Sequence, residues 1–392
     1  MKAYVFPGQG SQVKGMGEGL FERYPEETAI ADQILGYSIA DLCLKDEHHQ
    51  LHQTQYTQPA LYVVNALFYK EAIANVDIVP DYLAGHSLGE YNALQASGAI
   101  SFEDGLQLVK KRGELMSQAP KGAMAAILGS TEADIRLILD RNELSTIDIA
   151  NYNAPDQTVL SGLMDDIGRA QAFFDKEDIK FIPLNTSGAF HSRYMTPSGV
   201  EFKKYLQTFT FSALTIPVIS NVHAKPYEKS GIIDCLSAQI SHSVKWSDSI
   251  CYLLEKGVTE FSEIGIGVVL TTLVEKIREQ FQRQDGESTS DAAGRGAVPT
   301  SAPVTETKEG RDFVGDEQKN DSLENQDVGQ IVANWNKTYP IGSKVSVKNY
   351  DELLETRTNA TVLFGRRAAV YMKGFNGYFD LTEITPDNSK SR

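Results

Sequence analysis

The chain has 392 residues, 41% of them hydrophobic, and a formal net charge of −15, which allows a packed core and two or three domains. The acidic balance, with no basic stretch, excludes nucleic acid as the main partner. Three scattered cysteines give neither a disulfide framework nor the spacing of a zinc site. The apolar runs are too short for a signal peptide or a membrane span, so we expect a cytoplasmic protein.

Strand-like and helical runs alternate over residues 1–283, which predicts an α/β domain with a mostly parallel sheet. The expected elements are, in order, strand Ala3–Phe6, helices Gly17–Arg23 and Pro59–Ala74, strand Tyr82–Ala84, helix Ser101–Met116, strands Val218–Asn221 and Phe261–Ile264, and helix Val268–Phe281. Within this domain, residues 123–187 have a compact βαββαβ pattern. We interpret that segment as a small inserted subdomain of the split βαβ kind.

The composition changes after residue 283. Residues 284–330 are rich in Asp, Glu, Ser, Gly, Asn and Gln, with Phe313 as the single aromatic, and this predicts a disordered acidic linker. Strand-like runs return at Lys344–Val347, Ala360–Phe364 and Ala368–Met372. They predict a small β-rich domain over residues 331–386, followed by a tail of residues 387–392.

Residues Gly85–Gly89 form a G-x-S-x-G motif between the predicted strand and a predicted helix. A serine on such a sharp turn is exposed, and the free N–H groups of the helix N-terminus can hold a developing negative charge. The alternative is a glycine-rich turn that merely contains a serine. The strand and helix flanks favour Ser87 as a nucleophile.

A serine nucleophile needs a base, and the chain has seven histidines. His86 is adjacent to Ser87, and its side chain is expected to point away from the serine. Five further histidines lie in polar stretches or turns, namely His48, His49, His52, His223 and His242. His191 therefore remains, although its position alone does not separate it from an ordinary core or surface histidine.

Two further segments favour a ligand site. The glycine-rich loop Phe6–Gln12 follows the first strand, and ligands of α/β folds bind at the carboxyl ends of strands. Its N–H groups could complete an oxyanion hole, although a tight structural turn would look the same. Arg112 ends a helical run and could bind a carboxylate in bidentate fashion; the alternative is a solvated helix end.

Seven short motifs, in this order and spacing, resemble the malonyl-CoA:acyl carrier protein transacylase family over about residues 1–283. They are FPGQGSQ at 6–12, TQPA at 57–60, GHSLGE at 85–90, RGELM at 112–116, NYNAPDQ at 151–157, FHS at 190–192 and NVHA at 221–224. The resemblance implies an α/β-hydrolase-like core with an inserted ferredoxin-like subdomain. The sequence departs from the family pattern at Ile266 and Ser243, where proline is usual. These two departures leave the turn geometry near Gln239 open.

The resemblance also implies a role for each site residue. Ser87 would carry the acyl ester, His191 would be the base, and the N–H groups of Gln9 and Leu88 would form the oxyanion hole. The backbone carbonyl of Gln239 would orient His191. The substrate-binding residues would be Arg112, Met116 and Phe190, with Arg112 on the malonyl carboxylate and the bulk of Phe190 excluding methylmalonyl. The implied partners are malonyl-CoA and a phosphopantetheinylated acyl carrier protein, without a metal or redox cofactor.

The acidic linker and the β-rich tail resemble those of discrete, trans-acting acyltransferases of bacterial polyketide or hybrid peptide–polyketide synthases. The alternatives are a housekeeping fatty-acid malonyl transferase and an editing acyl hydrolase, a class that tends to lack the arginine. The C-terminal domain either docks the enzyme to its synthase or is an appendage without a binding role. We expect a monomer, because no heptad seam is visible.

Overall fold

The computed structural model describes residues 1–74, 79–228, 231–293, 328–347, 353–356, 360–363, 367–371, 378–381 and 384–386. The chain forms two compact units, Met1–Arg295 and Gly296–Arg392. No helix within these described ranges is long and apolar enough to cross a membrane.

The first unit is built on a parallel sheet of order β7-β2-β1-β8. Its strands are β1 (Lys2–Phe6), β2 (Tyr82–Gly85), β7 (Val218–Ile219) and β8 (Glu260–Glu263). Phe6 pairs with Gly85, so the loops that follow β1 and β2 leave the same edge of the sheet. This edge is where ligands of parallel α/β sheets bind.

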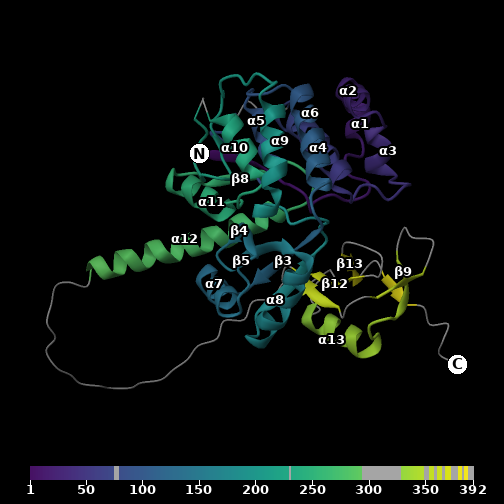
Figure 1. Ribbon diagram of the computed structural model, residues 1–392, viewed down its shortest axis with the longest axis vertical. Helices are drawn as coiled ribbons and strands as arrows, with labels where there is room; N and C mark the ends of the chain where they lie inside the picture. The colour runs from purple at the N-terminus through teal and green to yellow at the C-terminus, as the bar shows by residue number, and fades with distance from the viewer. Residues whose placement is uncertain are drawn as a thin grey trace, which may run out of the picture. The chain divides into compact units, whose positions relative to one another are not determined.

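Both faces of this sheet are covered, as expected for parallel strands. Tyr4 and Phe6 of β1 belong to one core and Ala3 and Val5 to another, because successive side chains of a strand point to opposite faces. On the first face, α4 (Thr54–Ala74), α5 (Gly89–Ala96), α6 (Phe102–Ser117) and α9 (Thr196–Leu206) pack beside one another (Figure 1). On the second face lie α11 (Trp246–Glu255) and α12 (Val269–Ala293).

The helices around this parallel sheet, on both of its faces, begin and end as follows. They are α1 (Leu20–Arg23), α2 (Pro25–Leu35), α3 (Ile39–Leu44), α4 (Thr54–Ala74), α5 (Gly89–Ala96), α6 (Phe102–Ser117), α9 (Thr196–Leu206), α10 (Ile232–Gln239), α11 (Trp246–Glu255) and α12 (Val269–Ala293). Ser101 caps α6 by accepting from the Asp104 N–H, which fixes the start of the helix that carries Arg112.

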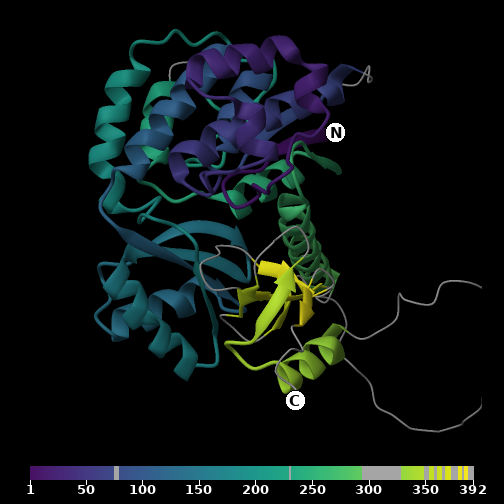
Figure 2. The ribbon, with the colours of Figure 1, turned by 90° about the vertical axis from the view of Figure 1, so that its right-hand side faces the viewer.

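A second, antiparallel sheet of order β4-β5-β3-β6 lies within the same unit (Figure 2). It consists of β3 (Gly122–Leu128), β4 (Asp148–Ala154), β5 (Gln157–Leu163) and β6 (Lys180–Leu184), with α7 (Glu132–Arg141) and α8 (Met164–Lys176). Ala125 and Ile127 of β3 pack against these two helices. Met124 and Ala126, on the opposite face, join the core of the larger layer.

The second unit combines one helix with short antiparallel strands in its described part. The elements are α13 (Val328–Thr338), β9 (Lys344–Val347), β10 (Leu354–Glu355), β11 (Thr361–Leu363), β12 (Arg367–Tyr371), β13 (Tyr378–Asp380) and β14 (Ile384–Pro386). They pair in the orders β10-β9-β14 and β11-β12-β13. Ile331, Val332 and Trp335 of α13 pack on the core of this unit, since their spacing puts them on one helix face.

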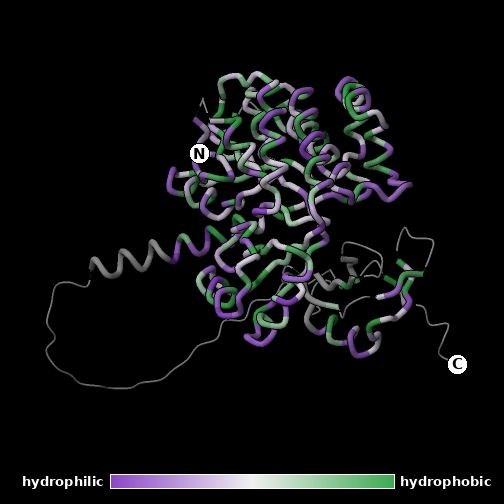
Figure 3. The backbone as a smooth tube through the Cα atoms, in the orientation of Figure 1, coloured by the Kyte–Doolittle hydropathy of each residue, from purple (hydrophilic) through white to green (hydrophobic). Residues whose placement is uncertain are grey.

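The predicted α/β organisation with a parallel sheet is confirmed, and two helices extend into the segment that was predicted as a linker. Helix α12 runs on to Ala293, past the predicted linker start, because the hydrogen bonds of a helix form within the segment itself. Figure 3 shows hydrophilic residues along the last coloured turns of α12. Helix α13 already begins at Val328. The rest of the predicted linker and the tail 387–392 lie outside the described residues.

Candidate active site

Ser87 lies in the turn between β2 and α5 with a φ of 52°, a conformation that few non-glycine residues adopt. Its neighbours make the turn possible. A Cβ on Gly85 would lie 1.9 Å from the carbonyl carbon of Gly89, and one on Gly89 would lie 2.0 Å from the Phe6 carbonyl oxygen. A Cβ on Gly8 would lie 2.3 Å from the His86 carbonyl oxygen. The glycine-rich loop after β1 and the serine turn therefore meet backbone to backbone.

His191 is the histidine that faces Ser87. Its Nε2 lies 2.7 Å from the Ser87 Oγ, and its Nδ1 lies 2.8 Å from the backbone oxygen of Gln239. A carbonyl only accepts, so Nδ1 carries the proton and Nε2 is left to accept from the serine hydroxyl. Burial, assisted by the positive charge of Arg112, lowers the pKa of His191 to about 3. The imidazole is therefore neutral, and its Nε2 faces the serine hydroxyl.

The other histidines do not face Ser87. The Nε2 of His86 lies 2.8 Å from the Asn153 Oδ1, and its ring packs 5.6 Å from that of Trp246, as expected for a residue that shapes the turn. The remaining five, at positions 48, 49, 52, 223 and 242, are exposed.

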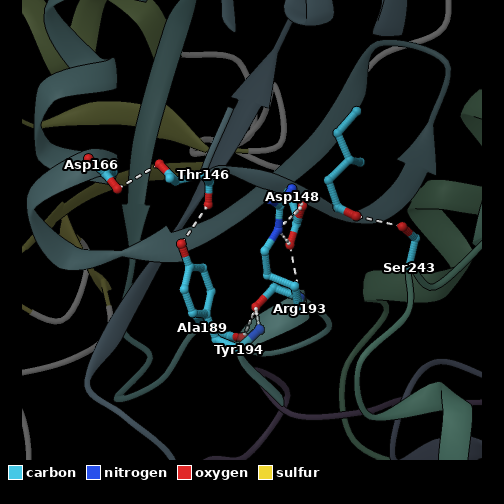
Figure 4. A network of polar contacts seen from close by, with 9 residues as sticks. Thr146, Asp148, Asp166, Ala189, Arg193, Tyr194 and Ser243 are labelled. Atoms are coloured by element: carbon cyan, nitrogen blue, oxygen red, sulfur yellow. Dashed lines mark hydrogen bonds and ion pairs between the residues drawn. The ribbon is translucent and has the colours of Figure 1, made fainter. Parts of the chain in front are cut away.

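The segment that carries His191 is tied to the small antiparallel sheet (Figure 4). Arg193 donates from its backbone N–H and its Nε to the Asp148 carboxylate at 2.8 and 3.0 Å, and the Tyr194 hydroxyl donates to the Thr146 carbonyl at 3.1 Å. Ser243, at a position where the family usually has a proline, donates its hydroxyl to the Ile149 carbonyl. These bonds hold the chain around His191, whose own φ is 57°, in a strained conformation.

Arg112 is almost completely buried, at 1% exposure, and reaches the serine from α6. Its Nη1 donates to the Gln58 Oε1 at 2.7 Å, and its Nη2 donates to the Gln239 Oε1 and to the Ser87 Oγ, both at 3.0 Å. Burial lowers its pKa, yet an arginine stays charged. Within the described ranges the guanidinium has no ion-pair partner and is held by amide oxygens. It is a buried cation that can accept an anionic ligand.

Gln9 and Leu88 directly follow Gly8 and Ser87 in the two loops that meet at the serine turn. Leu88 directly follows Ser87 and precedes α5, and the Cβ position of Gly8 lies 3.6 Å from the Leu88 nitrogen. In the described part of the chain, neither N–H donates to another backbone group. Backbone N–H groups that are free at such a turn are the kind of donor that an oxyanion needs.

Met116 and Phe190 belong to the larger hydrophobic core of the first unit. Both are buried. The Sδ of Met116 accepts from the Gln58 Nε2 at 3.4 Å, so it contacts the residue that holds Arg112. Phe190 precedes His191 in the chain, and a Cβ on Gly188 would lie 2.8 Å from its ring.

Four polar residues support the site without having been assigned a role from the sequence. The Asn221 Oδ1 accepts from the Ser87 N–H at 2.8 Å, and its Nδ2 donates to the Gly85 carbonyl at 2.7 Å. Gln58 holds Arg112, while Glu90 and Tyr227 bond each other at 2.6 Å behind Gln239. Gln58, Glu90 and Asn221 stand in the short motifs of the sequence, which was the available signal. Tyr227 gave none.

The comparisons with known proteins agree on one family. Residues 3–311 match the model of the acyl transferase domain. BaeC of Bacillus velezensis, a polyketide biosynthesis malonyl CoA-acyl carrier protein transacylase, is 57% identical over 284 residues, which cover 72% of this chain and 98% of that protein. The crystal structure of a malonyl CoA-acyl carrier protein transacylase from Burkholderia pseudomallei has a TM-score of 0.70 and 50% identity, and it covers 71% of this chain and 98% of that chain.

A third match comes from a structure of a type II PKS acyl-carrier protein in complex with its malonyl-transacylase. It has a TM-score of 0.68 and 32% identity, and it covers 71% of this chain and 93% of that chain. With the family model matching most of the chain, the predicted resemblance is confirmed. The chain belongs to the acyl transferase domain family, and the relatives reported above are named malonyl-CoA:acyl carrier protein transacylase or malonyl-transacylase.

Proposed function

We propose that this protein transfers malonyl from malonyl-CoA, through an ester on Ser87, to the phosphopantetheine thiol of an acyl carrier protein, acting in trans to a polyketide or hybrid synthase. One observation carries the proposal: the buried Arg112 cation lies 3.0 Å from the serine hydroxyl. A nucleophile beside an uncompensated cation suits an acyl group with a free carboxylate. The relatives' names and the carrier-protein complex among the structural matches support the donor and the acceptor.

In the first half-reaction His191 acts as general base. Its neutral Nε2 removes the Ser87 proton while Oγ attacks the thioester carbonyl. The carbonyl oxygen becomes an oxyanion held by the N–H groups of Gln9 and Leu88. When the C–S bond breaks, the proton passes from His191 to the sulfur of CoA, and malonyl remains as an ester on Ser87.

The second half-reaction runs through the same groups. The carrier's thiol gives its proton to His191, and the thiolate attacks the ester carbonyl. The C–O bond to Ser87 breaks, and Oγ recovers the proton from His191. The carbonyl of Gln239 keeps the imidazole in the tautomer that both steps need.

Arg112 distinguishes transfer of malonyl from hydrolysis of other acyl groups. Its guanidinium would bind the malonyl carboxylate and keep the ester in one place while the thiol arrives. A charged hydrogen bond of this kind is worth about 1.5–3 kcal/mol. Phe190, directly before the base, would leave no room for an α-methyl group. An editing hydrolase for neutral acyl groups has no use for a buried arginine at this point.

We also propose the finer architecture that the sequence predicted. The order β4-β5-β3-β6 with α7 and α8 supports a ferredoxin-like inserted subdomain over about residues 123–187. The serine turn after β2 supports an α/β-hydrolase-like core. The strands β9–β14 support a separate β-rich domain after the acyltransferase domain.

Partition of labelled malonyl between carrier and water tests the function. The protein is incubated with radiolabelled malonyl-CoA or acetyl-CoA, with and without a phosphopantetheinylated carrier protein. Malonyl should move to the carrier with little free malonate. Ser87→Ala should abolish transfer, while Ser117→Ala, which removes a hydroxyl bonded to the Glu114 carbonyl at the end of α6, should not. Rapid release of free acid with acetyl preferred would establish the editing hydrolase instead.

A further inference from the structure

A buried carboxylate lies behind the proposed active site. Glu90, in the first turn of α5, is completely buried. Its Oε1 accepts from the Asn221 N–H at 2.9 Å and from the Tyr227 hydroxyl at 2.6 Å, and its Oε2 accepts from the Gln239 Nε2. None of these bonds, as the described residues show them, reaches the serine hydroxyl or the base. The steps proposed above leave this carboxylate without a role, although burying it is costly.

The side-chain amide of Gln239 connects this carboxylate to Arg112. The Nε2 faces three acceptors, namely the Ser87 carbonyl at 2.7 Å, the Glu90 Oε2, and the Asn221 Oδ1 at 3.4 Å. The Oε1 faces Arg112 at 3.0 Å. Carboxylates and carbonyls only accept, and a guanidinium only donates. Turning the amide over would set oxygen against oxygen on one side and N–H against N–H on the other.

We propose that Glu90 is a positioning residue, which fixes the amide of Gln239 with its oxygen toward Arg112 and thereby holds the guanidinium ready for the malonyl carboxylate. This inference rests on the proposed function and names the group that sets its substrate choice. A carboxylate in direct contact with Arg112 would neutralise the cation and compete with the substrate. The Gln239 amide, placed between Glu90 and Arg112, orients the guanidinium without neutralising it, so the positive charge stays available to the ligand.

Glu90→Gln tests this positioning role because the substitution barely changes the shape of the side chain but reverses one hydrogen bond. The backbone N–H of Asn221 can only donate, so the oxygen of the new amide must stay at the Oε1 position. Its NH2 group then replaces Oε2 and faces the NH2 group of Gln239. Gln239 must turn its own NH2 toward Arg112 or lose the contact.

The readout is the ratio of kcat/KM for malonyl-CoA to that for acetyl-CoA, measured with the full chain and a phosphopantetheinylated carrier. Both donors are measured with the same preparation, so a loss of folded enzyme lowers both kcat/KM values equally and cancels in their ratio. In Glu90→Gln we expect the ratio to fall about tenfold to hundredfold, the effect of one charged hydrogen bond. Tyr227→Phe is the matched control, since it removes a donor from the same carboxylate but leaves the Gln239 contact. Its ratio should stay within about threefold of wild type.

Three outcomes decide the inference. A ratio that is unchanged in Glu90→Gln, or that falls equally in Tyr227→Phe, would overturn it and leave Glu90 as a structural carboxylate. Should Glu90→Gln fail to fold, Gln239→Met must lower the ratio in the same way. This substitution removes the side-chain amide but keeps the backbone carbonyl that faces His191. An unchanged ratio in Gln239→Met also overturns the inference. A wild-type protein without Ser87-dependent malonyl transfer would instead refute the proposed function.

Discussion

Replacing Arg112 by alanine removes the proposed malonyl clamp. The guanidinium has five N–H donors, and three hydrogen bonds engage its two terminal nitrogens. Its Nε has no partner among the described residues. Once Ser87 is acylated, the donor aimed at Oγ and the remaining N–H groups are available to a carboxylate.

The expected loss follows from these contacts. A charged hydrogen bond contributes about 1.5–3 kcal/mol, and each 1.4 kcal/mol is about tenfold in rate. The kcat/KM for malonyl-CoA should therefore fall about tenfold to 150-fold, while that for acetyl-CoA, which has no carboxylate, is unchanged or rises. The variant loses selectivity rather than catalysis.

The assay compares labelled malonyl-CoA and acetyl-CoA as donors to the same carrier protein. The control is Arg136→Ala, which removes an arginine paired with Glu132 on the exposed surface of α7. The control should keep the wild-type ratio of the two donors. If Arg112→Ala keeps that ratio too, Arg112 does not bind the substrate and the reasoning from its burial is refuted.

Three more predictions follow from the geometry of the site. Gly89→Ala places a Cβ 2.0 Å from the Phe6 carbonyl oxygen and should cost about 1–3 kcal/mol in thermal or denaturant unfolding, whereas Gly168→Ala, in open space on α8, should not destabilise; equal effects would contradict the close packing. Because burial holds the pKa of His191 at about 3, the base stays neutral well below pH 6.5, and the part of the unfolding free energy that depends on His191 is lost as the pH falls from 6.5 toward 3. An inflection near pH 6.5 in kcat/KM for malonyl-CoA would contradict this. Phe190→Ala should raise the use of methylmalonyl-CoA over malonyl-CoA about tenfold or more in a competition assay, and an unchanged preference would remove Phe190 from the specificity pocket.

The serine turn was predictable from residues alone because its constraints are local. Gly85, Ser87 and Gly89 stand between a strand and a helix, and the backbone clearances at both glycines explain the motif. Strand Lys344–Val347 was predicted to the residue. Helices α2, α3, α9, α10 and α11 were not predicted, because their apolar faces are short and are defined by what they pack against.

The rest of the site depends on contacts between distant segments. His191 and Arg112 were assigned through the family resemblance, since nothing local separates them from ordinary core or surface residues. Gln239 illustrates the limit. Its carbonyl meets His191 and its amide meets Arg112 and Glu90, a convergence that appears only once α10 has packed. The extent of α12 was missed because acidic composition indicates an absent core but not an absent helix.

Trapping the acyl-enzyme tests the central claim most directly. The protein is mixed with malonyl-CoA without carrier, quenched in acid and digested, and the modified peptide is located by mass spectrometry. We predict a malonyl ester on Ser87 that disappears when a phosphopantetheinylated carrier is added and never forms on Ser87→Ala. A malonyl group on another residue, or carrier loading that persists in Ser87→Ala, would contradict the account.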